Sequence, residues 1–192
     1  MLKCKIPGLI LVLSFAFSSM SYGVLILDQA CEDMGSVGLG FERGWWDWQE
    51  FRPTMDNLEQ VDLYIENVMV PSSVTVSFQV RDGGTVLWGT SFSADLISGY
   101  GWFEIDTPQI SLVPDNSYRL YLTSDLTYEQ ILGGAGLSWE AVENDPYSRG
   151  ISNWDSDIDF NFRTWAVPEP MTIALLAFGG LAVLRKRRGE SS

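Results

Sequence analysis

"TVSFQVRDGGTVLWGTSFS", residues 75–93, decides the fold of this 192-residue chain. Apolar residues hold every second position up to the turn: Val74, Val76, Phe78 and Val80. Successive side chains of a β-strand point to opposite faces, so this spacing predicts a strand with one buried face. The sequence Asp82-Gly83-Gly84 tolerates positive φ and therefore predicts a tight hairpin, with the second strand at residues 86–92.

The same alternation occurs along the rest of the chain. It is found at residues 61–66, 102–106, 118–122 and 159–165, and a further strand is expected after the glycine-rich bend at 133–136. At 61–66 the pattern predicts one buried face. About seven or eight short strands, separated by Gly, Pro, Asp and Asn turns, predict an all-β fold: an antiparallel β-sandwich of jelly-roll type, forming one domain at 24–165.

The N-terminal segment, residues 1–23, has the pattern of a secretory signal peptide. Lys3 and Lys5 precede an apolar run at residues 6–17, and the segment ends with Ser21-Tyr22-Gly23. The apolar run is shorter than the roughly 20 residues that a membrane-spanning helix needs. We therefore expect a signal helix that signal peptidase removes after Gly23, with an uncleaved anchor or a core helix as the alternative.

The C-terminal segment, residues 166–192, combines three features. Pro168, Glu169 and Pro170 come first, an apolar run follows at residues 171–184, and four basic residues close it: Arg185, Lys186, Arg187 and Arg188. As a helix the apolar run would be roughly 21 Å long, against about 30 Å for the hydrocarbon core of a bilayer. It is thus a marginal transmembrane helix, and the positive-inside rule predicts a cytoplasmic basic tail and an exported body.

These three parts, in this order and at this end of the chain, resemble the PEP-CTERM sorting signal of bacterial exported proteins. The resemblance implies that an exosortase, a membrane-embedded cysteine transpeptidase, recognises Pro168, Glu169 and Pro170 and cuts near them. The helix would then be a transient inner-membrane anchor, and the body would pass to the cell surface or extracellular matrix. The body resembles, more weakly, the β-sandwich domains of such proteins, which are broadly similar to carbohydrate-binding jelly rolls; no ligand residues follow from this.

Composition excludes several functions for the body. Residues 24–167 contain six Arg, no Lys and 23 Asp or Glu, a formal balance of −17, so nucleic acid is not an expected partner. The chain has no His, which excludes Ser-His-Asp and Cys-His catalysis and His-ligated zinc. Cys31 is the one cysteine after the signal segment, and is expected to be a buried thiol or to pair between chains. We predict that the protein is not an enzyme, with a hydrolase that uses two unidentified carboxylates as an alternative.

Three tryptophans lie close together at Trp45, Trp46 and Trp48. Exposed Trp rings can stack on sugar rings, so this stretch is a candidate glycan platform. The competing interpretation places Trp46 and Trp48 in the core, because they have strand spacing and aromatic side chains bury large areas.

Three carboxylates alternate at Asp155, Asp157 and Asp159, which puts them on one face if the segment is extended. Such a cluster would suit a structural Ca²⁺, since calcium takes oxygen ligands. A hydrated acidic loop is the competing interpretation, and no other cofactor is expected.

Together these features predict an exported, non-enzymatic cell-surface or matrix protein. Its expected partners are signal peptidase, an exosortase-type transpeptidase and, transiently, the inner membrane. The alternative is a carbohydrate-binding module that binds extracellular polysaccharide.

Overall fold

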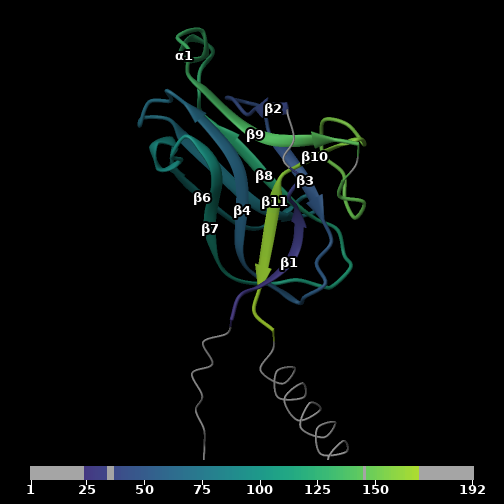
Figure 1. Cartoon of the computed structure of the whole chain (residues 1–192). Coiled ribbons are helices and arrows are strands. Elements are labelled where there is room, and N and C mark those ends of the chain that lie inside the picture. Colours follow the sequence, from purple (N-terminus) through teal and green to yellow (C-terminus); the bar gives the residue numbers. More distant parts are fainter. Residues whose placement is uncertain (1–23, 34–36, 145, 169–192) are drawn as a thin grey trace, which may run out of the picture.

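The computed structural model describes residues 24–33, 37–144 and 146–168, and within them the fold is all-β and mostly antiparallel. Two sheets pack face to face as a β-sandwich (Figure 1). The seven-stranded sheet contains β1 (Ile26–Cys31), β2 (Val37–Gly40), β4 (Asn57–Val68), β7 (Tyr100–Ser111), β9 (Gly136–Glu143), β10 (Ile158–Phe160) and β11 (Phe162–Ala166). The four-stranded sheet contains, in spatial order, β3 (Asp47–Phe51), β8 (Tyr118–Ser124), β5 (Thr75–Asp82) and β6 (Thr85–Ser93).

The predicted hairpin at residues 75–93 is confirmed. Strands β5 and β6 pair antiparallel and join through Gly83 and Gly84, with Asp82 opposite Thr85. Gly83 has a φ of 52°, the left-handed conformation that the sequence Asp-Gly-Gly favours. The strand then places Val76, Phe78 and Val80 in the core, as their spacing predicts.

Strand β4 is the centre of the seven-stranded sheet. One edge pairs with β7, and the other pairs first with β11, at residues 60–63, and then with β9, at residues 65–68. Strand β1 pairs with the other edge of β11. Strand β2 pairs with the far edge of β9, whereas β10 pairs with the edge of β9 that also pairs with β4. Strands β11 and β9 thus pair with successive parts of the same edge of β4.

The strand expected at 159–165 is two strands, and this expectation is corrected. Strand β10 pairs with β9, β11 pairs with β4, and Asn161 stands between them. The Asn161 amide donates to the Glu140 carbonyl at 2.8 Å, and its own carbonyl accepts from the Tyr64 amide at 3.2 Å and from Trp139 Nε1 at 2.9 Å. Asn161 thus bonds to both neighbouring strands where the chain changes partner.

The face of 61–66 that carries Val61, Leu63 and Ile65 is buried, as predicted, and the opposite face is covered as well. Asp62 and Tyr64 point away from the core, yet they are only 3% and 9% exposed. Trp165 donates from Nε1 to Asp62 Oδ2 at 2.7 Å, and Trp102 packs edge-on against Tyr64 at 5.0 Å. Neighbouring strands carry these large side chains onto the outer face of β4, so both of its faces are covered.

The core lies between the sheets and is aromatic. Trp139 is fully buried and stacks on Phe160, with ring centroids 4.3 Å apart. The other large side chains that lose nearly all their exposure are Phe41, Phe51, Phe78, Phe162, Leu58, Leu63, Ile65, Leu120, Leu122 and Leu126. Such a core fixes the two sheets relative to each other and so fixes what their outer faces present.

Helix contributes little to the described residues. The helix α1 (Tyr128–Leu132) and a single 3₁₀ turn (Ala94–Leu96) are both short. Thr127 caps α1, since its side chain and that of Gln130 bond reciprocally to each other's backbone amides. No helix in the described ranges is long and apolar enough to cross a membrane. The predicted signal helix at 1–23 and transmembrane helix at 171–184 lie outside those ranges.

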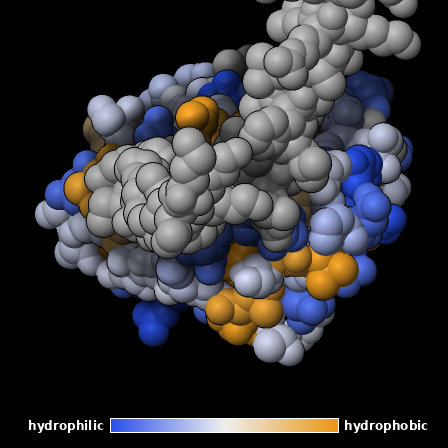
Figure 2. Space-filling model, turned by 90° about the horizontal axis from the view of Figure 1, so that it is seen from below, coloured by the Kyte–Doolittle hydropathy of each residue, from blue (hydrophilic) through white to orange (hydrophobic). Residues whose placement is uncertain are grey.

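The chain enters and leaves the sandwich at the same end. Ile26 at the start of β1 is paired with Ala166 at the end of β11. The amide group of Asn57, at the start of β4, bonds to both the carbonyl and the amide of Val167, at 2.8 and 2.9 Å. Viewed from this end, the surface shows apolar side chains grouped among hydrophilic ones (Figure 2). Helix α1 lies at the opposite end (Figure 1).

Candidate functional site

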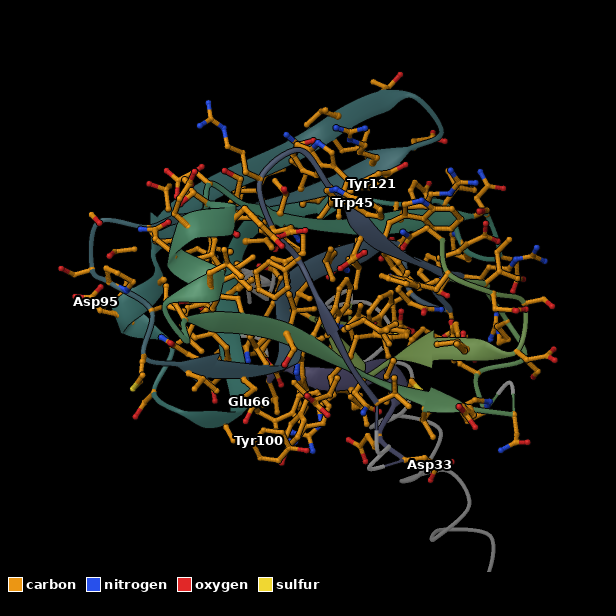
Figure 3. All side chains as sticks on the ribbon, turned by 90° about the horizontal axis from the view of Figure 1, so that it is seen from above. Asp33, Trp45, Glu66, Asp95, Tyr100 and Tyr121 are labelled. Atoms are coloured by element: carbon orange, nitrogen blue, oxygen red, sulfur yellow. The ribbon has the colours of Figure 1, made fainter. Side chains whose placement is uncertain are left out.

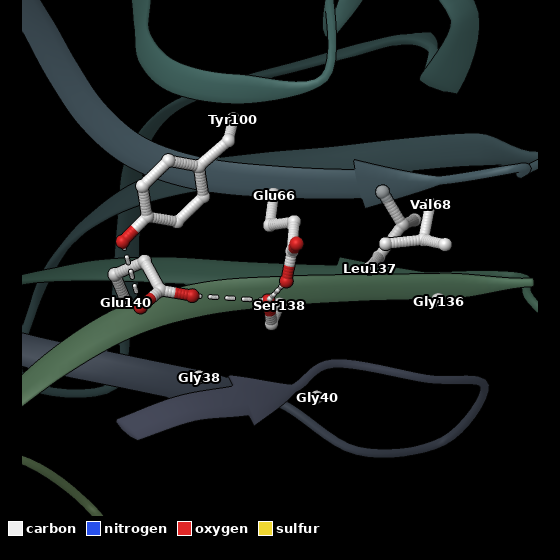
Figure 4. A pocket seen from close by; sticks show the side chains of 9 residues that line it. All are labelled: Gly38, Gly40, Glu66, Val68, Tyr100, Gly136, Leu137, Ser138 and Glu140. Atoms are coloured by element: carbon white, nitrogen blue, oxygen red, sulfur yellow. Dashed lines mark hydrogen bonds between the residues drawn. The ribbon is translucent and has the colours of Figure 1, made fainter. Parts of the chain in front are cut away.

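A groove with a volume of about 550 Å³ opens on the outer face of the seven-stranded sheet (Figure 4). It lies where the C-terminal end of β4 pairs with β9, and where β9 pairs with β2 along its other edge. Its lining residues are Gly38, Gly40, Glu66, Val68, Tyr100, Gly136, Leu137, Ser138 and Glu140. A smaller and more apolar hollow of about 230 Å³, next to α1, shares Gly40, Gly136 and Leu137 with it.

Glycine creates the depth of the groove. Gly38 and Gly40 in β2 lie opposite Glu140 and Ser138 in β9. A Cβ atom on Gly38 would stand 2.7 Å from Glu140 Oε1, closer than a real Cβ approaches an oxygen. The carboxylate of Glu140 can therefore lie over β2 because residue 38 has no side chain.

The polar groups of the groove converge on a serine. Ser138 Oγ lies 3.4 Å from Glu66 Oε2 and 3.2 Å from Glu140 Oε1, and the Tyr100 hydroxyl lies 3.4 Å from Glu140 Oε2 (Figure 4). These separations are longer than the 2.5–3.0 Å, roughly, of a well-formed O–H···O bond. One serine hydroxyl also donates only one hydrogen, so it cannot satisfy both carboxylates together. The two carboxylates retain capacity to accept hydrogen bonds from a ligand.

The electrostatics of the two carboxylates differ. Burial raises the pKa of Glu140, hydrogen bonds from Ser138 and Tyr100 lower it, and the nearby negative charge of Glu66 raises it. The Glu140 residue is only 5% exposed, whereas Glu66 is half-buried. The groove thus places a buried and a more hydrated carboxylate around one hydroxyl.

One aromatic ring, that of Tyr100, lines the groove, and other rings pack near it on the same face. Tyr64 packs edge-on against Tyr100 at 4.8 Å, and the Arg163 guanidinium lies 3.9 Å from the ring centre of Trp102. Tyr100 remains 53% exposed. Its ring is therefore available at the margin of the groove.

The tryptophans expected as a glycan platform lie on the opposite side of the sandwich. Trp45 and Tyr121 lie on one side and Glu66 and Tyr100 on the other (Figure 3). Trp45 is 60% exposed and Trp46 36% exposed, while Trp48 is half-buried. The interpretation that places Trp46 and Trp48 in the core is therefore wrong.

The inward positions of this segment are polar instead. Asp47 and Gln49 point into the protein and are 1% and 0% exposed. Gln49 bonds to Asp159 Oδ1 and to the Phe160 amide, both at 2.8 Å. These partners lie more than 100 residues away in the sequence, so local alternation cannot reveal them.

Asp47 is a buried carboxylate with an incomplete set of partners. Its Oδ1 accepts from Trp154 Nε1 at 2.8 Å and from Asn153 Nδ2 at 3.4 Å. Its Oδ2 is buried and has no hydrogen-bond partner among the described residues. Burial raises the pKa of Asp47 to about 6, although the two hydrogen bonds oppose that shift.

The structure does not bring Asp155, Asp157 and Asp159 onto one face. Asp155 and Asp157 are exposed in a turn, whereas Asp159 is fully buried in β10, where its Oδ2 accepts from the Tyr147 amide at 3.1 Å. The backbone is extended only from residue 158 onward, so the expected alternation fails. No group of three metal-ligating side chains occurs within residues 24–33, 37–144 and 146–168.

Of the remaining predicted residues, Cys31 and Pro168 are among the described residues and the others are not. Cys31 is buried, with 3% exposure, and burial together with the charge of Asp159 raises the pKa of its thiol to about 12. Pro168 is buried and is the last residue described. Glu169, Pro170 and the basic residues Arg185, Lys186, Arg187 and Arg188 lie outside the described residues.

Sequence reasoning missed the residues of the groove. Glu66 and Ser138 are brought together by the register of β4 with β9, across 72 positions. Their one visible signal is glycine at alternate positions, Gly38 and Gly40, within a strand. Glycine in a strand often marks the close approach of another group.

Comparisons with known proteins assign no family: no family model matches the chain, and no curated protein or solved structure matches it. Functional inference therefore depends on the chain's own residues.

Proposed function

We propose that this chain is an exported, non-catalytic cell-surface or matrix protein whose β-sandwich binds hydroxyl-rich polysaccharide in the groove of Glu66, Ser138 and Glu140. The C-terminal signal delivers the body, and the groove holds it to its target. The observation that carries the binding proposal is the arrangement of two carboxylates around one serine hydroxyl at distances of 3.2 to 3.4 Å.

The chemistry of the groove favours neutral, hydroxyl-bearing ligands. Carboxylates accept strong hydrogen bonds from hydroxyl groups, and the long internal contacts of Glu66 and Glu140 leave them free to do so. The negative charge of the pair disfavours an acidic ligand at the same place. The exposed ring of Tyr100 offers an apolar surface to the faces of sugar rings.

The placement of the groove supports a tethered binding module. The start of β4 bonds to Val167, beside the segment that carries the sorting signal, and the groove is lined by Glu66 and Val68 near the end of the same strand. At roughly 3.3 Å per residue, about 30 Å of strand separate Asn57 from Glu66. A body held at the membrane by its C-terminal helix would present the groove away from the anchor.

A jelly-roll assignment is part of this proposal. Without β2, β9 and β10, the order β1-β11-β4-β7 faces the order β3-β8-β5-β6. Eight strands in two four-stranded sheets are the composition of a jelly roll. In the full chain, the predicted signal helix and transmembrane helix would flank this body.

Binding is tested by titrating the full chain, in a neutral detergent, with soluble neutral polysaccharides such as dextran and galactan, using calorimetry. We expect Glu140→Gln and Ser138→Ala to weaken binding at least about tenfold, the usual cost of a lost hydrogen bond to a charged group. Glu143→Gln is the matched control, because Glu143 is an exposed carboxylate on the same strand. No binding by the unaltered chain, or equal losses in the control, would refute the groove as the binding site.

Glycoside hydrolysis is the second candidate, and the carboxylate pair is the reason to consider it. Such hydrolysis needs one carboxylic acid of raised pKa and a second, ionised carboxylate. Burial raises the pKa of Glu140, and Glu66 is a second carboxylate beside the same serine hydroxyl. The non-catalytic proposal predicts no new reducing ends after prolonged incubation with any bound polysaccharide. Release that stops in both Glu66→Gln and Glu140→Gln would establish the hydrolase instead.

Sorting is tested in cells that contain an exosortase. Replacing Pro168, Glu169 and Pro170 with alanine should leave export intact and hold the body in the inner membrane. Fractionation and mass spectrometry measure both outcomes. Surface protein of the mature mass from the altered chain would reject the sorting signal while leaving the binding proposal intact.

A further inference from the structure

The outer face of the four-stranded sheet carries a strip of arginine and aromatic side chains. We call it the arginine–aromatic strip; its members are Trp46, Trp48, Arg81, Arg119 and Tyr121. The sheet register brings them together, since Trp48 lies opposite Tyr121 across β3 and β8, and Arg119 lies opposite Arg81 across β8 and β5. The strip therefore crosses three strands of a rigid sheet.

Each arginine lies over a ring. The Arg119 guanidinium carbon is 4.0 Å from the ring centre of Trp48, and that of Arg81 is 4.2 Å from Tyr121 and 5.3 Å from Trp46. Trp48 and Tyr121 pack against each other with centroids 6.2 Å apart. A guanidinium stacked on a ring uses its face for that contact and keeps N–H donors at its edge for another partner.

The charges of the strip are under-compensated. Two like charges directly opposite each other in a sheet destabilise it unless something offsets them. Among the described residues, Arg119 has one carboxylate neighbour, Glu50, at 3.9 Å. Arg81 donates from Nε to the Gln79 side chain at 2.8 Å, and no ion pair within the described ranges joins it to a carboxylate. A chain segment with a formal balance of −17 thus keeps two of its six arginines together on one open face.

We propose that the arginine–aromatic strip binds an acidic polysaccharide, a sugar chain that bears uronate carboxylates. Arginine edges match a carboxylate with two parallel hydrogen bonds, and planar rings between them suit the faces of sugar rings. The neighbouring hydroxyls of Ser77, Ser91 and Thr123 lie along the same face; Ser77 and Ser91 bond to each other at 2.9 Å, and Thr123 donates to the Trp45 carbonyl. This site lies on the other sheet from the groove and has the opposite charge preference, so it does not depend on the groove.

The experiment compares two forms of one sugar chain. The full chain in a neutral detergent is titrated with polygalacturonate and with its fully methyl-esterified form, which keeps the backbone and loses the charge. Tryptophan fluorescence and calorimetry report binding, because Trp46 and Trp48 belong to the strip. We expect binding of the acidic form, at least about tenfold weaker binding of the ester, and weakening by added salt.

Variants assign the binding to the strip. Arg81→Gln and Arg119→Gln should each weaken polygalacturonate binding about tenfold, the cost of one charge-assisted hydrogen bond. Arg119→Lys keeps the charge but loses the planar guanidinium, so its affinity for polygalacturonate should lie between that of the unaltered chain and that of Arg119→Gln. Arg149→Gln is the control, since it removes the same charge from an arginine that pairs with Asp115 elsewhere. None of these changes should alter binding of neutral polysaccharide at the groove.

Three outcomes would overturn the proposal. The first is equal binding of the acidic and esterified chains, and the second is an equal loss in Arg149→Gln. The third is binding of polyaspartate as tight as that of polygalacturonate, which would mean that the strip recognises charge and not a sugar chain. Thermal unfolding of each variant, measured alongside, identifies any variant whose loss comes from unfolding.

Discussion

The two outer faces of the sandwich use aromatic residues in different ways. On the seven-stranded sheet, Tyr64 is only 9% exposed because Tyr100 and Trp102 close over it edge-on. On the four-stranded sheet, Trp48 and Tyr121 remain half-buried, and what covers their rings is arginine. Aromatics on the first face extend the packing of the protein, whereas those on the second face carry arginine side chains and stay partly exposed.

The polar groups on the two faces also differ in sign. The first face has Glu66 and Glu140 in a groove, and the second has Arg81 and Arg119 on a flat strip. A sandwich buries only the inner face of each sheet, so packing alone does not require either arrangement. The two outer faces are therefore chemically specialised.

The largest expected difference is in the cost of removing the central ring of each face. Tyr64→Ala should lower the free energy of unfolding by about 3 kcal/mol, because a nearly buried ring leaves a cavity. Tyr121→Ala should lower it by about 1 kcal/mol, since its ring is partly hydrated and mainly supports a cation–π contact. Urea unfolding of the two variants measures both values. Equal losses would show that the second face is packed like the first.

Local features of the sequence were sufficient to predict the sandwich. The hairpin at 75–93 depends on the alternation of apolar residues and on the positive φ of Gly83, and both are features of residues close together in the sequence. Local patterns do not reveal what residues distant in the sequence decide. Tyr64 is covered by residues of another strand, and Gln49 turns inward toward Asp159, 110 positions away.

The candidate sites were predicted only in part. Exposed tryptophan could be expected from Trp45, Trp46 and Trp48, but the arginines over Trp46 and Trp48 could not, because strand register brings them there. The groove could not be predicted, since the pairing of β4 with β9 creates it. Register depends on the whole core, which a local pattern does not specify.

The second prediction concerns the buried carboxylate beneath the four-stranded face. Burial raises the pKa of Asp47 from 3.8 to about 6. Between these values the folded protein holds a proton that the unfolded chain releases, so this group's contribution to stability falls as the pH rises. Asp47→Asn removes that dependence. Relative to the unaltered chain, the free energy of unfolding of Asp47→Asn should therefore rise between pH 4 and pH 7. The expected rise is about 2 kcal/mol, and its upper limit is about 3 kcal/mol.

Chemical unfolding of both proteins at several pH values measures this difference. The carboxylates that the two proteins share contribute equally to both free energies of unfolding, so their contributions cancel in the difference. A constant difference across the range would mean that Asp47 titrates normally. The carboxylate would then not be excluded from water between Trp46 and Trp48.

The third prediction separates the two glycines of the groove. Gly38→Ala should lower stability by about 1 kcal/mol, because the new Cβ would lie 2.7 Å from Glu140 Oε1 and must displace it. Gly40→Ala is the matched control, since its Cβ would meet only the Leu137 carbonyl at 3.6 Å, an ordinary contact. Binding of neutral polysaccharide should weaken in the first variant alone. Equal effects of the two would show that the groove does not depend on the position of Glu140.

The smallest expected effect is the coupling between Arg119 and Trp48, whose guanidinium carbon and ring centre are 4.0 Å apart. A double-mutant cycle with Arg119→Gln and Trp48→Leu should give about 0.5–1 kcal/mol, the range for a cation–π contact at an exposed site. A cycle that pairs Arg149→Gln with Trp48→Leu is the control and should give a coupling near zero.

Arg163 and Trp102, at 3.9 Å on the other face, should couple with similar strength. Arg163→Gln alone should lower the free energy of unfolding more than Arg119→Gln does, because Arg163 also pairs with Glu32 and Asp62. Zero coupling for Arg119 and Trp48 would mean that this arginine does not rest on the ring in solution, and a guanidinium would then be held on a tryptophan ring on the first face only.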